Sequence, residues 1–272
     1  MNRALIVTRR EVTEVMRDVN LVAPMLMLPT LMAVVSGLAV FSTATTQTGT
    51  VGVIMTTIAT EQVGTRVANQ FLGLSAEAQE AAVQKVIKAL LIPMFWIVTV
   101  GLTATVSADS FVGEKERGTL EPLLATPIRV GELLFGKMLT AVVLAVLGTW
   151  FGVAIFATLV WQSNTPYLPK FLLADPDWAI AILVIVPLCA TMSGAISAII
   201  STRASTYRSA YQLNGLVVLP IVAMLIPQTM LLYFMTPRAL PILAIGFIML
   251  DVLLVQAAMH VFDRERLIGG GR

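Results

Sequence analysis

The string in this sequence that comes nearest to a catalytic motif begins at Gly131 and reads GELLFGKM. A phosphate-binding P-loop has the form GxxxxGK followed by Ser or Thr, because backbone amides hold the phosphate and the hydroxyl binds magnesium. Met138 takes the place of that hydroxyl residue, and the intervening ELLF favours a helix over a loop. We therefore expect this string not to bind nucleotide.

A single carboxylate within an apolar segment is the second candidate. Asp251 lies near the middle of the apolar run 239–261. A carboxylate inside a membrane is costly and is by default a functional candidate, whether for binding a cation, relaying a proton or responding to a substrate. The other interpretation, which we favour slightly, is a hydrogen bond that ties two helices together. Both interpretations stay open on the sequence.

The remaining reactive side chains are too few for a catalytic or metal site. Cys189 is the only cysteine, which excludes an intrachain disulfide, and His260 is the only histidine, which gives no basis for a His-rich metal site. An intramembrane enzyme would need a His/Glu pair or two aspartates, and no such arrangement is evident. We therefore predict no catalytic residue, no bound cofactor and no metal ligand in this chain.

The composition shows which elements must carry these residues. Of the 272 residues, 57% are hydrophobic and 12% are charged, against about 45–50% and about 25% in soluble domains. Disordered, disulfide-rich secreted and nucleic-acid-binding classes are excluded, and an integral membrane protein is indicated. A spanning helix needs about 20 mainly apolar residues. Six windows qualify, so we predict an all-α bundle with spans near 21–41, 90–109, 138–161, 178–201, 213–234 and 239–261.

Lysine and arginine in the loops predict the orientation of the bundle. With the N-terminus inside the cell, the inner segments hold thirteen of these cations and the outer segments hold five, Arg66, Lys85, Lys88, Lys170 and Arg238. Both termini are therefore expected in the cytoplasm, in a multi-pass protein of the cell membrane. The inner cations are Arg3, Arg9, Arg10, Arg17, Lys115, Arg117, Arg129, Lys137, Arg203, Arg208, Arg264, Arg266 and Arg272.

Two segments outside the spans are expected to be helical. In the N-terminal segment, Leu5, Val12, Met16 and Val19 recur at about helical spacing, which predicts an amphipathic helix along the inner membrane surface. The alternative is a plain charged flank that orients the first span. In the outer loop 42–89, the run from Ser75 is a strong helix former that should continue into the second span.

Small residues predict where helices pack closely. Gly148 and Gly152 form a GxxxG pattern in the third span. The fourth span has a small-residue face made of Ser193, Gly194, Ser197 and Ala198. Such patterns let two backbones approach each other in a membrane.

The loop between the second and third spans, residues 110–137, carries the strongest signal. Gly118 suits the end of one helical turn, Thr119 can cap the next, and Pro122 falls in a first turn, where its missing amide proton costs little. A short helix near 120–125 with a leucine edge and charges around it is typical of a docking element for another protein. The alternative is a solvated turn.

At these residues the sequence resembles the ABC-2 type permeases, the membrane subunits of many ATP-binding-cassette exporters. The run GEKERGTLEPLLATPIRVGELLFGK is similar to the signature of that family, and RREVTEVMRDVNLVAPMLMLPTLM is similar to its opening. The resemblance implies a permease that pairs with itself, or with a related permease, and with two copies of a separate ATPase that binds ATP and magnesium. It also implies a coupling helix formed by Glu116, Arg117, Gly118, Thr119, Leu120, Glu121, Leu123 and Leu124, and a smaller contact formed by Arg203, Tyr207 and Arg208.

Two other transport classes fit the sequence less well. Import permeases carry an EAA motif with a glycine in a cytoplasmic loop, whereas Glu80, Ala81 and Ala82 are followed by no such glycine and lie on the predicted outer side. An ion-gradient-driven transporter or channel working without an ATPase is the alternative for which Asp251 is the best argument. That alternative gives the charged docking loop no purpose, so we expect an exporter whose substrate the sequence does not identify.

Overall fold

The computed structural model describes residues 3–45, 76–113, 130–162, 176–204, 206, 208–210, 212–215 and 239–269. Every element in these ranges is a helix, as expected for an all-α membrane protein. The elements are α1 (Arg3–Val15), α2 (Val19–Thr45), α5 (Ala76–Ala108), the π-helix η1 (Asp109–Gly113), α8 (Val130–Gln162), α10 (Pro176–Ala179), the π-helix η2 (Ile180–Ile185), α11 (Val186–Arg203) and α13 (Ala239–Gly269).

Within the described ranges, five helical segments are long and apolar enough to cross a membrane. They are Val19–Leu38, Leu91–Gly113, Gly131–Gln162, Pro176–Ser201 and Leu240–Val261. Each overlaps one of the six predicted windows. The remaining window, 213–234, lies almost wholly outside the described residues.

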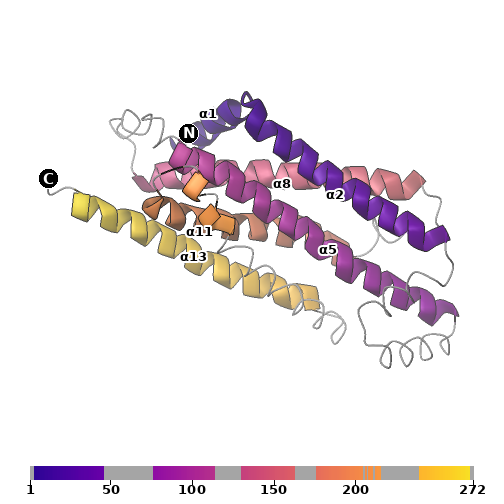
Figure 1. The fold of residues 1–272 in the computed structure, drawn as a ribbon. Coiled ribbons are helices and arrows are strands. Elements are labelled where there is room, and N and C mark those ends of the chain that lie inside the picture. The colour runs from indigo at the N-terminus through magenta and orange to yellow at the C-terminus, as the bar shows by residue number, and fades with distance from the viewer. Residues whose placement is uncertain are drawn as a thin grey trace.

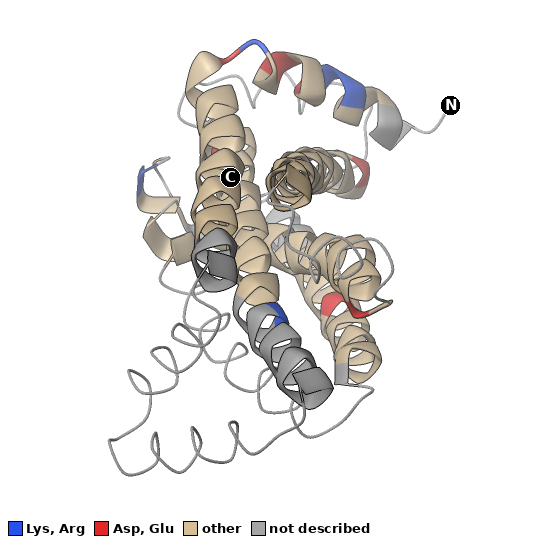
Figure 2. Ribbon diagram, turned by 90° about the vertical axis from the view of Figure 1, so that its right-hand side faces the viewer, with Lys and Arg blue, Asp and Glu red and all other residues tan. Residues whose placement is uncertain are grey.

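The long helices lie side by side in one bundle (Figure 1). The N-terminus and the C-terminus lie at the same end of this bundle (Figure 1). Helix α1 crosses that end and carries several charged residues, whereas the long helices are mostly uncharged (Figure 2). The charged end therefore contains α1 and the flanks of the loop that was predicted to dock a partner.

The glycines of the third span bring α8 against α2. A Cβ at Gly152 would come within 2.6 Å of Pro29 Cβ and 2.9 Å of the Pro29 carbonyl oxygen, and one at Gly148 would lie 3.2 Å from the Met25 carbonyl oxygen. These distances leave no room for a side chain at Gly152. The predicted close packing at this GxxxG pattern is confirmed, and α2 with its two internal prolines is its partner.

The small-residue face of the fourth span packs against α5. The Ser193 hydroxyl donates a 3.0 Å hydrogen bond to the Val100 carbonyl. A Cβ at Gly194 would lie at ordinary contact distance from Thr103 and Val142. The predicted packing role of this face is therefore confirmed.

Aromatic residues join the helices toward the other end of the bundle. The ring centroids of Phe95 and Phe156 are 5.8 Å apart, and the Trp178 ring stacks on Phe156 at 6.1 Å. The Trp96 and Trp150 indoles donate hydrogen bonds of 3.3 Å and 3.0 Å to carbonyls of η2. Two tryptophans from α5 and α8 thus bind the backbone of the π-helical turn in the fourth span.

One predicted helix boundary is confirmed and others are wrong. Helix α5 begins at Ala76, so the helix expected from Ser75 does continue into the second span. The ends of the loop predicted at 110–137 are wrong, because residues 110–113 form part of η1 and residues 130–137 belong to α8. The cause is burial, since the apolar side chains of Phe111, Val112, Leu134 and Met138 pack in one core cluster.

The N-terminal helix is present as α1, and Val12 of its predicted apolar face packs against a core cluster, but the predicted face was wrong at Met16 and Val19. Met16 and Val19 lie beyond the end of α1 and are 57% and 75% exposed. The buried face is instead made of Val7, Thr8, Glu11 and Val15. The spacing of apolar residues alone does not predict this face, because it includes a buried threonine and a buried glutamate.

Candidate functional site

The segment that the sequence predicts to dock a partner lies outside the described residues. This applies to Glu116, Arg117, Gly118, Thr119, Leu120, Glu121, Leu123 and Leu124, which all fall in the range 114–129. Both flanks of that range are described, because η1 ends at Gly113 and α8 begins at Val130. The structure therefore describes the two elements between which segment 114–129 runs.

The first flank is a π-helical turn that directly follows the C-terminal end of α5. Four of its five residues, Ser110, Phe111, Val112 and Gly113, are buried. A π-helical turn is rare and occurs often at functional sites. Because carbonyls in the last turn of a helix lack partners within the helix, this turn can offer backbone oxygens to other groups.

A buried ion pair connects the second flank to α1. The Lys137 ammonium on α8 lies 2.9 Å from Glu11 Oε1 on α1. The side chains are only 1% and 8% exposed. A buried charge pair offsets the cost of losing water only if its remaining hydrogen-bonding groups are also satisfied.

Ser110 in η1 supplies those remaining bonds. The Lys137 Nζ donates to the Ser110 carbonyl at 2.7 Å and lies 3.3 Å from the Ser110 hydroxyl. That hydroxyl donates in turn to Glu11 Oε2 at 2.9 Å. An ammonium has three N–H donors, so all three have an acceptor within this network.

A further hydrogen bond lies beside the network. The Thr8 hydroxyl on α1 donates to the Gly136 carbonyl on α8 at 3.1 Å, and Thr8 is buried. Two consecutive residues of α8 therefore contact α1. Helix α1, the turn η1 and the first turns of α8 form one polar junction, which lies at both flanks of segment 114–129.

The structure also explains the P-loop-like string. Residues 131–138 belong to α8, so the ELLF segment is helical and does not form a phosphate-binding loop. The lysine of the string is Lys137, which is buried against Glu11 and Ser110. Its ammonium is thus committed to the junction rather than to a phosphate group.

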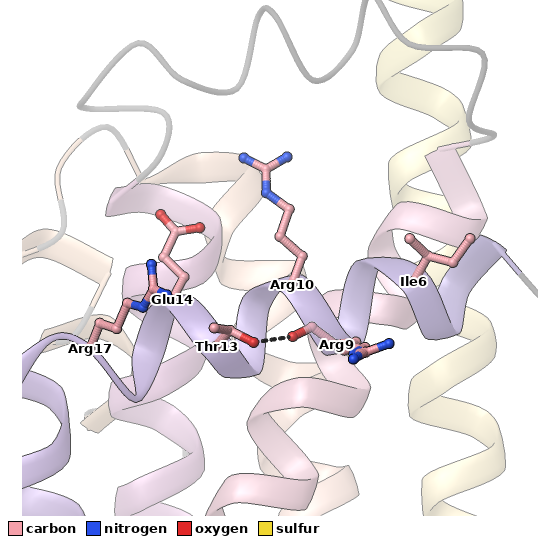
Figure 3. Close-up of a pocket in the computed structure, with 6 residues that line it drawn as sticks. All are labelled: Ile6, Arg9, Arg10, Thr13, Glu14 and Arg17. Carbon is pink, nitrogen blue, oxygen red and sulfur yellow. Dashed lines mark hydrogen bonds between the residues drawn. The ribbon is translucent and has the colours of Figure 1, made fainter.

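The outward face of α1 is open and carries charge. Ile6, Arg9, Arg10, Thr13, Glu14 and Arg17 line a groove of about 550 Å³ along this helix. Arg10 and Glu14 project from the same side of α1, and the Thr13 hydroxyl donates to the Arg9 carbonyl at 2.8 Å (Figure 3). The polar side predicted for this helix, with Arg10, Glu14 and Arg17, is confirmed as exposed. Helix α1 thus has one face fixed to the bundle and one face open.

The second predicted contact is described only in part. Arg203 is the last residue of α11, Arg208 is exposed, and Tyr207 lies outside the described residues. The Ser209 amide donates to the Thr206 hydroxyl and the Thr206 amide donates to the Ser209 hydroxyl, both at 3.2 Å. This reciprocal pair is typical of a helix N-terminus. Arg208 is therefore presented on a short capped turn after α11.

Asp251 lies within the bundle on α13 and is 5% exposed. Neither of its carboxylate oxygens has a hydrogen-bond partner among the residues that the structure describes. It lies within electrostatic range of the buried Cys189 thiol on α11. The expected hydrogen bond between two helices is thus not seen in the described part of the chain.

Comparison with known proteins identifies the family. Residues 5–262 match the family model described as ABC-2 family transporter protein. The chain belongs to the ABC-2 transporter family. Part of this ABC-2 protein, 152 residues, is 28% identical to the ABC transporter permease protein NatB of Bacillus subtilis (strain 168), and the match covers 54% of this chain and 39% of NatB.

Family membership decides between the classes that the sequence left open. An ABC-2 protein is a transporter permease, a membrane subunit that is not an enzyme. The resemblance seen at the loop and the N-terminal segment is therefore confirmed. An ion-gradient-driven transporter of another class is not supported.

The junction of this ABC-2 protein was missed in the sequence analysis. Glu11 was not singled out there, and Lys137 was considered only as the lysine of the P-loop-like string, as the last residue of the family signature and as one of the inner cations. The sequence did contain a signal for a buried ion pair, because one charge of each sign lies among apolar residues at helical spacing. Glu11 lies between Val7 and Val15, and Lys137 lies between Leu134 and Ala141. Two opposite charges of this kind suggest a buried pair, because each would be costly alone.

Proposed function

We propose that this permease forms the transmembrane pathway of an exporter whose ATP hydrolysis is carried out by a separate ATPase subunit. The observation that carries the proposal is the family match over residues 5–262. It is supported by the P-loop-like string, which is helical and whose lysine is bound elsewhere. ATP and magnesium would be held by the partner, and this chain would bind neither.

The proposed coupling element is segment 114–129 at the charged end of the bundle. Its flanks are connected by the polar junction, in which Ser110 of η1 and Lys137 of α8 are buried. A segment whose two flanking helices are fixed to each other can transmit the movement of a bound protein to the bundle. We assign the main contact to the eight residues from Glu116 to Leu124 that are named above.

The open face of α1 and the turn after α11 would enlarge this contact. Arg9, Arg10 and Arg17 are exposed on α1, and Arg208 is exposed on the turn. Exposed arginines suit a protein surface with carboxylates. We propose that Arg203, Tyr207 and Arg208 form the smaller ATPase contact.

The assembly is proposed to contain two permease copies and two ATPase copies in the cell membrane, with the permease termini in the cytoplasm. ATP binding and hydrolysis would move the pair between inward-open and outward-open states. The common end of the two termini in the bundle agrees with an even number of spans (Figure 1). The second permease copy is either identical or closely related.

Asp251 is proposed as a polar site along the pathway. It is buried and lacks a hydrogen-bond partner within the described residues, which distinguishes it from the bonded Ser193 on α11. A carboxylate with this environment can respond to a cation, a proton or a polar substrate group. The class of substrate is left open by this argument.

Replacement of the docking segment tests the proposed function. The permease would be purified with the ATPase encoded beside it, and complex formation and ATP hydrolysis would be measured for Glu116→Gln and Leu123→Ala. For the double variant that carries both changes, we expect the affinity for the ATPase to fall at least tenfold, because the variant loses a charge and an apolar side chain. Leu159→Ala, which changes an exposed leucine near the far end of α8, should bind like the parent.

Three results would contradict these proposals. If the parent permease forms no complex with the ATPase, or if it transports in vesicles that contain neither the ATPase nor ATP, the exporter proposal fails. If the parent forms the complex and the docking variant binds as tightly as Leu159→Ala, the assignment of the contact to segment 114–129 fails.

A further inference from the structure

The polar junction connects three elements that are separate along the chain. Helix α1 lies before the first span, η1 ends the second span and α8 begins the third. Glu11, Ser110 and Lys137 come from these three elements and are 6%, 3% and 1% exposed. Each of the three side chains contacts the other two.

The arrangement is a closed ring of hydrogen bonds. Lys137 donates to Glu11 Oε1, the Ser110 hydroxyl donates to Glu11 Oε2, and Lys137 also donates to the Ser110 carbonyl. Each carboxylate oxygen has a donor, and the ammonium has an acceptor for each of its protons. A fully satisfied buried network is rigid, because opening it would leave a charge buried without a partner.

The two faces of α1 differ sharply. Its inward face holds Thr8 and Glu11 against α8, whereas Arg9, Arg10 and Glu14 on its outward face are exposed. An interfacial helix that only orients the first span has no need of a buried carboxylate. The buried carboxylate instead fixes α1 to the two flanks of segment 114–129.

We propose that Glu11, Lys137 and Ser110 are positioning residues that hold α1 and both flanks of segment 114–129 as one rigid body. Movement of the docked segment then carries α1 with it, and α1 carries α2, to which it is joined by the short turn at Arg17 and Asp18. The inference rests on the proposed role of segment 114–129, but the rigidity itself does not depend on the ATPase.

A distance between two spin labels tests this rigidity. In a Cys189→Ala background, Thr13→Cys labels the exposed face of α1 and Trp161→Cys labels the far end of α8, where Trp161 is 64% exposed. Labelled chains would be diluted with unlabelled ones, so that only distances within one chain are read. We expect one narrow distance distribution, with the same mean when the ATPase and ATP with magnesium are present.

Matched variants connect the rigidity to the three residues. Glu11→Gln should at least double the width of the distribution, because the amide cannot balance the buried ammonium. Glu14→Gln makes the same chemical change on the exposed face of α1 and should leave the width unchanged. Ser110→Ala keeps the ion pair and removes only the hydroxyl, so we expect an intermediate width and a variant that folds even if Glu11→Gln does not.

The proposal is overturned by any of three results. The first is a broad distribution in the parent, and the second is a mean distance in the parent that changes when ATP is added to the complex. The third is a Ser110→Ala distribution as narrow as that of Glu14→Gln. Failure of the ATPase to bind would instead contradict the proposed function, since the measurement without ATPase still reports on the junction.

Discussion

At the scale of single residues, buried polar groups in this protein fall into two kinds. Glu11 and Lys137 satisfy each other with the help of Ser110, so they stabilise a fixed geometry. Asp251 has no hydrogen-bond partner in the described ranges although it is 5% exposed. A buried polar group without a partner costs about 1–3 kcal/mol of stability. The place proposed for Asp251 along the transport pathway would account for the retention of this cost.

Replacement of Asp251 by leucine should separate stability from function. We expect Asp251→Leu to raise the unfolding free energy of the purified permease by about 1–3 kcal/mol, and with it the thermal unfolding temperature, because an apolar side chain replaces an unsatisfied carboxylate. The same variant should lose coupling between substrate and ATP hydrolysis. Unfolding followed by fluorescence and ATPase assays of the complex would measure the two effects.

Ser193→Ala is the control for this change, since its hydroxyl is bonded to the Val100 carbonyl. It should destabilise the permease by about 1 kcal/mol. If Asp251→Leu destabilises the protein as well, Asp251 is a structural link between helices and its proposed place in the pathway is wrong.

At the scale of elements, helix packing followed from the sequence better than helix boundaries did. The glycines of the third span and the small residues of the fourth predicted close contacts that are present. The ends of the predicted loop 110–137 were misplaced, because tertiary burial of Phe111 and Leu134 extends the helices into it. The buried face of α1 was missed because Glu11 is polar, and only its partner on α8, distant in sequence, explains its burial.

The contact between α2 and α8 can be tested with a single methyl group. Gly152→Ala would place a Cβ 2.6 Å from Pro29 Cβ, so the two helices must separate. We expect a loss of about 1–3 kcal/mol of stability. Thermal unfolding of the permease in detergent would measure the change.

Gly101→Ala on α5 provides the matched control. No described atom lies within 4 Å of the Cβ that it would add, and alanine favours a helix over glycine by about 1 kcal/mol. This variant should therefore be as stable as the parent or more stable. Equal losses for the two variants would show that α2 and α8 do not pack as described.

At the scale of the whole molecule, membrane insertion and family were evident from the sequence, whereas the junction required the fold. Apolar windows and the run from Gly113 to Lys137 are local features of the chain. The junction joins residues 99 and 126 positions apart, a separation that no local pattern encodes. The docking residues themselves lie outside the described part of the chain, so their contacts stay a prediction.

Cytoplasmic termini are a prediction from the sequence, because the predicted inner segments hold thirteen cations and the predicted outer segments hold five. In a Cys189→Ala background, we expect Trp161→Cys to react with a membrane-impermeant thiol reagent in intact cells. Thr13→Cys should react only after the membrane is permeabilised. The reverse pattern would contradict cytoplasmic termini.

The central claim is that a separate ATPase drives movement of this permease, and one distance measurement tests it most directly. Spin labels at Trp161→Cys and Ile242→Cys, both exposed positions, would be placed near the ends of α8 and α13 that lie away from α1, in the Cys189→Ala background. We predict that ATP with magnesium shifts the distance between the labels when the ATPase is bound and has no effect when it is absent. The same distance with and without ATP in the assembled complex, or a shift without the ATPase, would contradict this account.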